Sequence, residues 1–173
     1  MKKRVPRRLS SGENNTVVAL TEKEVAKLFT GDTRSDIGSE AEKMKYANEI
    51  NDLVVKFIRL DIMGEDVETL VMEHLYSMDF RAFEVEKRAL IFDVFEDELY
   101  QLHKAGFAHR DLRRPSDMPG LRYDNIFLTQ TRIRLIDVGI SALRDKVGDR
   151  LFQRFIKVEL EEMEEFRKFF LSR

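Results

Sequence analysis

Three polar residues in the second half of the chain have the types and the order that phosphoryl transfer requires. Asp111 is followed by Asn125 and then by Asp137. A carboxylate can orient an attacking hydroxyl or accept its proton, and carboxylate and amide oxygens suit Mg²⁺ held beside phosphates. The chain contains no cysteine, which excludes thiol nucleophiles and zinc–thiolate sites. Chemistry on a nucleoside triphosphate is therefore the first hypothesis.

The residues around Asp111 and Asp137 extend this pattern. Residues 102–112 read L-H-K-A-G-F-A-H-R-D-L, and residues 136–139 read I-D-V-G. Together with Asn125 they resemble the catalytic loop and metal-binding segment of the eukaryotic-like protein kinase family, L-H-x-x-G-x-x-H-R-D-L, then N, then D-F-G. The resemblance implies that Asp111 is the catalytic base, that Asn125 and Asp137 bind Mg²⁺, and that ATP is the phosphoryl donor. It makes the two histidines of segment 102–112 structural.

The same resemblance assigns partners in the first half of the chain. Lys27 lies where the family has the lysine that contacts the phosphates, and Glu40 lies where the family has the glutamate that pairs with it. Glu42 is the alternative to Glu40 if the register shifts. We also assign Glu73 and Leu75, which follow the last strand expected in this half, to nucleotide binding.

A reduced phosphate-binding loop precedes Lys27. Residues 9–17 align with the family pattern L-G-x-G-x-F-G-x-V, and only the middle glycine is present, as Gly12. Ser10 and Asn15 replace the other two, although asparagine tolerates a left-handed backbone better than most residues. We expect Gly12 to contact the nucleotide.

The spacing inside the catalytic loop departs from the family pattern. Asn125 follows Asp111 by 14 residues, whereas the family's asparagine follows its aspartate by about five. The extra residues, which include two prolines and a glycine, predict a looped-out excursion. Either it is a surface loop, or its Arg113, Arg114 and Arg122 bind an anionic substrate.

The part that follows Gly139 is short. Only 34 residues remain and none is proline, so the family's A-P-E motif is missing. In this respect the chain resembles minimal bacterial kinase-like proteins, and Val138 in place of the family's phenylalanine fits such atypical groups.

The first 75 residues show short β-branched runs and one helical pattern. Apolar residues at three- and four-residue steps predict a helix over 37–50. The β-branched runs predict a small antiparallel sheet. We expect its strands at 16–20, 25–29, 54–60 and 68–72, with one more near 5–9.

The rest of the chain is expected to be mainly helical. One apolar stripe leads to Gly106, a natural helix C-cap, and a second stripe marks a long terminal helix. We interpret the glutamate-rich run 159–165 as a solvated face, and favour core packing of Phe166, Phe169 and Phe170 over their exposure to a partner. The first stripe contains Val85, Ala89, Phe92, Phe95, Leu99 and Leu102; the second contains Leu151, Phe155, Val158, Met163, Phe166 and Phe170.

Composition narrows the remaining classes. No apolar stretch approaches the ~18 residues of a membrane span, and a net charge of −2 with short charge runs argues against nucleic-acid binding. We interpret the basic residues among the first eight as a solvated terminus. We expect a monomer that acts on a protein substrate or partner. It would work in the cytoplasm, or in the cytosol of another cell if it is exported.

These observations predict an α+β, two-lobed protein-kinase-like fold. Residues 1–75 would form an antiparallel-sheet lobe with one helix, and residues 76–173 a reduced, mainly helical lobe. The leading functional hypothesis is an ATP- and Mg²⁺-dependent Ser/Thr kinase. The alternatives are a catalytically weak pseudokinase that acts as a protein-binding module, and a kinase of small molecules or sugars.

Overall fold

The first half of the chain forms an antiparallel sheet. The computed structural model describes residues 7–11, 15–29, 37–114 and 122–173. Each hairpin joins neighbouring strands, and β5 lies between β3 and β4, which gives the order β1-β2-β3-β5-β4. The strands are β1 (Arg7–Ser11), β2 (Asn15–Ala19), β3 (Glu24–Phe29), β4 (Phe57–Met63) and β5 (Val67–Glu73).

The predicted strands are present, with one shift. The strand expected at 54–60 begins at Phe57. Val55 instead donates its backbone N–H to Leu135 O at 2.8 Å, and Leu135 donates to Leu53 O at 2.8 Å. Residues 53–55 are therefore extended, but they join the two halves of the molecule and leave the sheet to begin two residues later.

One helix packs on this sheet. Helix α1 (Ile37–Ile50) has the predicted bounds, and it buries Ala41, Met44 and Ala47 on the face toward the core. Its Asn48 accepts the Phe57 N–H at 2.9 Å and donates to Val54 O at 3.2 Å. These bonds fix the end of α1 against the start of β4.

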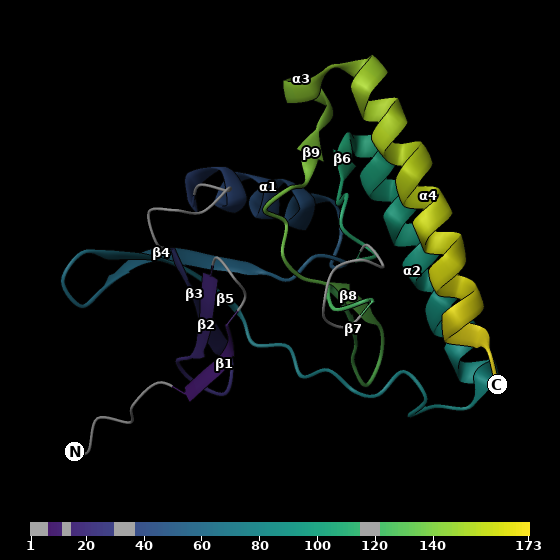
Figure 1. Cartoon of the computed structure of the whole chain (residues 1–173), viewed down its shortest axis with the longest axis horizontal. Coiled ribbons are helices and arrows are strands. Elements are labelled where there is room, and N and C mark those ends of the chain that lie inside the picture. The colour runs from purple at the N-terminus through teal and green to yellow at the C-terminus, as the bar shows by residue number, and fades with distance from the viewer. Residues whose placement is uncertain (1–6, 12–14, 30–36, 115–121) are drawn as a thin grey trace.

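The second half is dominated by two long helices that lie side by side (Figure 1). Short two-stranded sheets, β6 with β9 and β7 with β8, carry the segments between them. The elements are α2 (Val85–Ala105), β6 (Phe107–Ala108), β7 (Ile126–Leu128), β8 (Ile133–Leu135), β9 (Ala142–Leu143), α3 (Arg144–Val147) and α4 (Asp149–Leu171). The α+β fold with a small antiparallel sheet and a helical second part is confirmed.

Helix α2 ends as predicted. Phe92, Phe95, Leu99 and Leu102 are buried, and Gly106 has φ of 100°, the left-handed conformation that glycine adopts at low cost. Its N–H donates to Leu102 O at 3.1 Å. The turn then leads the chain straight into β6 and the segment that contains Asp111.

The stripe predicted for α4 is partly wrong. Leu151 and Val158 are 41% and 54% exposed, while Phe152 and Glu159 are buried. Phe155 is half-buried. The buried positions follow alternating four- and three-residue steps, the spacing of a helix that packs along its length. They are Phe152, Ile156 (half-buried), Glu159, Met163, Phe166 and Phe170.

The carboxyl end of α4 accepts hydrogen bonds from two arginines, one in the segment before α2 and one in the first turns of α2. Arg81 donates to Phe169 O at 2.8 Å, and the buried Arg88 donates to Phe170 O and to Ser172 O. Guanidinium groups satisfy the last carbonyls of a helix and interact favourably with its negative end. This end of α4 is therefore fixed on α2.

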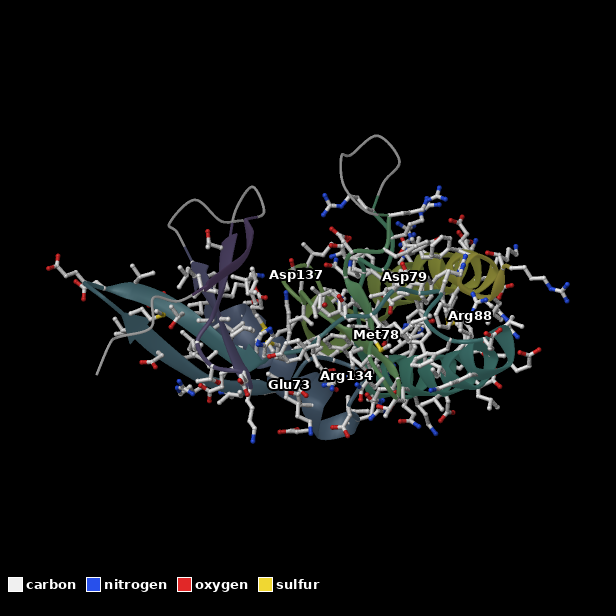
Figure 2. All side chains as sticks on the ribbon, turned by 90° about the horizontal axis from the view of Figure 1, so that it is seen from below. Glu73, Met78, Asp79, Arg88, Arg134 and Asp137 are labelled. Atoms are coloured by element: carbon white, nitrogen blue, oxygen red, sulfur yellow. The ribbon has the colours of Figure 1, made fainter. Side chains whose placement is uncertain are left out.

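An ion pair joins the two halves near the end of β5. Arg134 on β8 donates to Glu73 at 2.8 Å and to Val54 O at 3.3 Å, and Figure 2 shows the two side chains together where the sheet meets the helical part.

Among the described residues, no helix combines the length and the apolar composition needed to cross a membrane.

The aromatic residues of α4 allow a test of this packing. Phe166 is fully buried and Phe169 is 41% exposed. We expect Phe166→Ala to lower the free energy of unfolding by about 3–5 kcal/mol, because it leaves a cavity between α2 and α4. Phe169→Ala should cost about 1 kcal/mol or less. Urea denaturation of both variants measures the difference, and equal losses would contradict the packing of α4.

Candidate active site

A buried lysine joins three segments of the chain. Lys27 lies on β3, and its Nζ is 2.8 Å from Glu40 Oε1 on α1 and 3.1 Å from Asp137 Oδ1. The side chains of Lys27 and Glu40 are 5% and 2% exposed, whereas that of Asp137 is 49% exposed. The structure thus brings the predicted lysine, its predicted glutamate and one predicted metal ligand together. Glu42 instead lies near Lys146, at 3.5 Å.

The charges of this cluster support one another. Burial alone would lower the pKa of Lys27, but Asp137 and Glu40 outweigh it and raise that pKa above its ordinary value. For Asp137, the loss of surrounding water would raise the pKa, but the ammonium of Lys27 outweighs this effect and lowers it. Lys27 is therefore charged, and Asp137 is ionised and partly open to solvent.

The backbone around Asp137 is held in an uncommon conformation. Asp137 has φ of 57°, in the left-handed region that few non-glycine residues adopt. Its Oδ1 accepts the Gly139 N–H at 3.3 Å, and Lys43 on α1 donates to Gly139 O at 2.9 Å. Strained backbone of this kind persists only where its surroundings fix it, and it gathers at functional sites.

Asp111 and Asn125 are adjacent in spite of the 14 residues between them. The Asn125 amide nitrogen donates to Asp111 O at 3.0 Å and to Asp111 Oδ2 at 2.9 Å. Asn125 is buried, and its amide oxygen is the atom that could bind a metal. Burial raises the pKa of Asp111, and the charge of Asp137 adds to the shift, while His109 and the Asn125 hydrogen bond oppose it.

The excursion between these residues closes at its base. Arg114 donates its backbone N–H to Arg122 O at 2.7 Å, which brings the two ends together. Arg113 forms an ion pair with Glu165 on α4, and Arg114 forms one with Asp124. Two of the three arginines predicted as possible anion ligands therefore have carboxylate partners within the chain, and the third, Arg122, is exposed.

Backbone groups are also fixed by His109. Its side chain is fully buried, and its Nε2 lies 2.9 Å from Ile136 O. Its own carbonyl accepts the Ser141 hydroxyl at 3.0 Å. The structural role predicted for His109 matches these contacts, because they join the segment before Asp111 to the segment that carries Asp137.

Glu159 is a functional candidate that sequence reasoning missed. It is 1% exposed, so its interpretation as part of a solvated face is wrong. Its carboxylate accepts a hydrogen bond from His103 Nε2 at 2.8 Å and another from the backbone N–H of Arg110. Burial would raise the pKa of Glu159, but the His103 hydrogen bond and nearby charge outweigh it and lower that pKa. Its place on the buried stripe of α4, at the spacing of the phenylalanines, was the available clue.

Arg110 adopts a strained backbone directly above this carboxylate. Its φ is 70°, its side chain donates to Ile140 O at 3.1 Å, and its guanidinium lies 3.7 Å from the centre of the Phe155 ring. Glu159 therefore anchors the residue immediately before Asp111. The arginine itself contacts the chain on both sides of the site.

The remaining predicted nucleotide contacts have different outcomes. The Glu73 carboxylate is paired with Arg134 and its backbone N–H donates to Lys56 O, and Leu75 is half-buried against the main core. Gly12 and residues 1–6 of the basic terminus lie outside the described residues. Nucleotide binding by Gly12, Glu73 and Leu75 stays a prediction.

The donors present fit Mg²⁺ bound together with phosphates. Among the described residues, no three His, Cys, Asp or Glu side chains form a cluster suited to a metal. Mg²⁺ usually takes one or two protein oxygens plus water and substrate phosphates, not an all-protein cage. An ionised Asp137 and the amide oxygen of Asn125 match that requirement.

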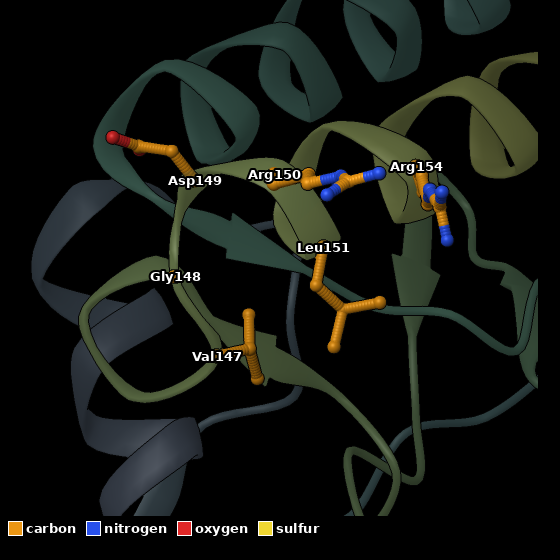
Figure 3. Close-up of a pocket in the computed structure, with 6 residues that line it drawn as sticks. All are labelled: Val147, Gly148, Asp149, Arg150, Leu151 and Arg154. Carbon is orange, nitrogen blue, oxygen red and sulfur yellow. The ribbon is translucent and has the colours of Figure 1, made fainter.

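A pocket near the start of α4 lies apart from these residues. Figure 3 shows its lining, which comes from the turn between α3 and α4. The lining residues are Val147, Gly148, Asp149, Arg150, Leu151 and Arg154. None of them belongs to the cluster around Lys27 and Asp111, so this pocket is not the candidate active site.

The Glu162 carboxyl, which lies against the segment after Asp111, is expected to make the free energy of unfolding depend on pH. Glu162, one turn after Glu159, faces the Leu112 N–H, and burial together with Glu159 raises its pKa from 4.5 to about 7. Because the folded chain holds this proton more tightly, the stability contribution is complete below pH 4.5 and is lost as pH rises through 7. Glu162→Gln should remove this slope and raise stability at pH 8 by about 1–2 kcal/mol, after allowance for solvent screening.

Urea denaturation between pH 4.5 and 8 measures the effect, with the exposed Glu164→Gln as the matched control on the same helix. The control should keep the wild-type slope. Parallel curves for the wild type and Glu162→Gln would contradict the burial of this carboxyl.

Comparison with known proteins supports the fold but does not assign the chain to a family. No family model matches the chain, and no curated protein matches it. Among solved structures, the kinase PK-1 of the Cydia pomonella granulovirus is similar, with a TM-score of 0.58 and 16% identity over 79% of this chain and 51% of that one. The chain therefore spans about half the length of PK-1. At this identity the likeness shows a protein-kinase-like fold.

Proposed function

We propose that the chain is an ATP- and Mg²⁺-dependent phosphotransferase of the protein-kinase-like type, which transfers phosphate to Ser or Thr hydroxyls. Two neighbouring sets of contacts carry the proposal. The Lys27 ammonium lies between Glu40 and Asp137, at 2.8 and 3.1 Å, and Asp111 is held by Asn125 at 2.9 Å. This arrangement supplies a fixed cation, an ionised oxygen ligand and a candidate base.

Each residue has a separate task in this proposal. Lys27, oriented by Glu40, binds phosphate oxygens of ATP, and Asp137 with Asn125 would hold the metal. The metal, when bound, neutralises charge on the phosphates. Asp111 orients the acceptor hydroxyl and takes its proton, and burial raises the pKa of Asp111, which makes its carboxylate a better base. Catalysis would then come mainly from positioning and electrostatic stabilisation.

The charge arrangement favours an enzyme over a binding module. Removing a lysine and a glutamate from water costs stability, which an ion pair recovers only in part. A module that only holds a partner does not need the buried Lys27–Glu40 ion pair. It also does not need the half-exposed Asp137 beside that pair, held in a left-handed backbone conformation. The intramolecular partners of Arg113 and Arg114 also give no support to an anionic small-molecule acceptor.

The proposal is tested by two readouts on the same variants. We expect Lys27→Ala and Asp137→Asn to lose both Mg²⁺-dependent ATP binding, measured by thermal shift, and phosphate transfer from γ-labelled ATP. Asp111→Asn should keep ATP binding and lose about 10²–10⁴-fold in transfer, the range expected for a general base. Hydrolysis of the labelled product should yield phosphoserine or phosphothreonine.

Matched controls are available on the surface. Lys23→Ala and Asp145→Asn change the same residue types at exposed positions, and both should behave as the wild type. ATP binding with no transfer in the wild type would leave a pseudokinase. Equal labelling by the wild type and Asp111→Asn would refute the assigned base.

A further inference from the structure

The β4 strand ends the sheet on one side. Within the described chain its strand neighbour is β5 alone, and Figure 1 shows the β4–β5 hairpin reaching outward from the rest of the sheet. An edge strand offers unpaired backbone groups to another strand, and native proteins usually protect such edges. The backbone groups and side chains that β4 exposes therefore indicate what kind of strand could pair with it.

The register shows which backbone groups face outward. Glu73 donates its N–H to Lys56 O at 2.9 Å, so every second residue of β5 turns its peptide groups toward β4. Their partners on β4 include Arg59 and Asp61, opposite Val71 and Thr69. The peptide groups of Leu60 and Ile62 then face outward, in agreement with the Ile62 N–H, which is bonded to the Asp61 side chain at 2.9 Å.

The same strand carries an exposed apolar strip. Leu60 and Ile62 are 46% and 64% exposed, and Ile58 precedes them at the register shift between Phe57 and Arg59. Leu60 lies opposite Leu70, which in turn lies opposite Lys27, so the strip is on the face of the sheet that α1 covers elsewhere. Two exposed aliphatic side chains on one face of an edge strand favour an interaction surface over a solvated edge.

The strand also carries one basic and one acidic residue, which would face each other if two copies of the strand paired antiparallel. Arg59 and Asp61 flank Leu60, with side chains 43% and 49% exposed, and within one chain Arg59 pairs with Glu24 at 2.9 Å and with Asp61 at 3.4 Å. If two such strands pair antiparallel about Leu60, each Arg59 lies opposite an Asp61 of the other strand. Protective charges of a single sign would repel a second copy, whereas these two attract one.

We propose that the chain forms a twofold-symmetric dimer in which the β4 strands of two copies pair antiparallel, centred on Leu60. Leu60 of each copy lies opposite Leu60 of the other, and Arg59 lies opposite Asp61. The outward peptide groups of Leu60 then bond those of the second copy, and the apolar strips merge on one face. A self-complementary contact of this kind closes as a dimer, and it replaces the monomer expected from the sequence. It involves no candidate active-site residue and stands apart from the proposed activity.

A charge-swap series tests the pairing. Sedimentation of the full chain up to about 100 µM should show a dimer, since association with a micromolar Kd is then nearly complete. Asp61→Arg should weaken dimerisation about tenfold or more, because two attractive cross-strand pairs become repulsive. The triple variant Glu24→Arg, Arg59→Asp and Asp61→Arg also reverses the Arg59–Glu24 ion pair, and it should restore affinity to within about threefold of the wild type. Glu65→Arg, in the adjacent turn, is the charge-matched control and should leave dimerisation unchanged.

A single introduced cysteine tests the register. The chain has no cysteine, so any covalent dimer reports the introduced position alone. Leu60→Cys should form a disulfide-linked dimer under mild oxidation, since directly opposite residues lie about 5.5 Å apart between Cα atoms, within disulfide range. Ile62→Cys should not link to itself, because its two copies lie four positions, about 13 Å, apart along the strands.

Other results would overturn the proposal. These are a monomer across the concentration range, a dimer that ignores both charge variants, or equal cross-linking at positions 60 and 62. Circular dichroism of each variant confirms that loss of dimer is not loss of folding.

Discussion

The burial of the Lys27 ammonium is the constraint on which the site depends. A charged group at 5% exposure is stable only if nearby charges replace the water it has lost. Glu40 and Asp137 do so from two different segments, α1 and the loop after β8. Satisfying one charge therefore fixes the position of α1 on the sheet and places Asp137 at the junction of the two halves. The Asn48, Lys43 and Arg134 hydrogen bonds maintain the same arrangement.

A second buried charge organises the other side of the site. Glu159 on α4 binds the backbone before Asp111, while His109 binds the backbone before Asp137. Helix α4 is therefore part of the support for the segment that carries Asp111, and Phe166 and Phe170 fix this helix on α2. This explains how so short a helical half can hold Asp111: a single helix supplies both the aromatic packing and the polar anchor.

Much of this arrangement could be predicted from sequence. The strands, the bounds of α1 and the grouping of Lys27 with Glu40 follow from periodicity and motif order, because local pattern and family resemblance agree there. Glu159 and Glu162 could not be found in that way, since a run of glutamates indicates a solvated face unless the phase of the buried stripe is known. The start of β4 was also missed, because Val54 and Val55 are β-branched like the residues of a sheet strand, but residues 53–55 pair with Leu135, about 80 residues away. Pairings at such distance leave no local pattern.

A crystal structure of the chain with Mg²⁺ and a non-hydrolysable ATP analogue tests these assignments most directly. We expect Mg²⁺ about 2.1 Å from an Asp137 carboxylate oxygen and from the Asn125 amide oxygen, with a phosphate oxygen against Lys27 Nζ. A nucleotide bound elsewhere, or a metal that contacts neither Asn125 nor Asp137, would contradict these assignments.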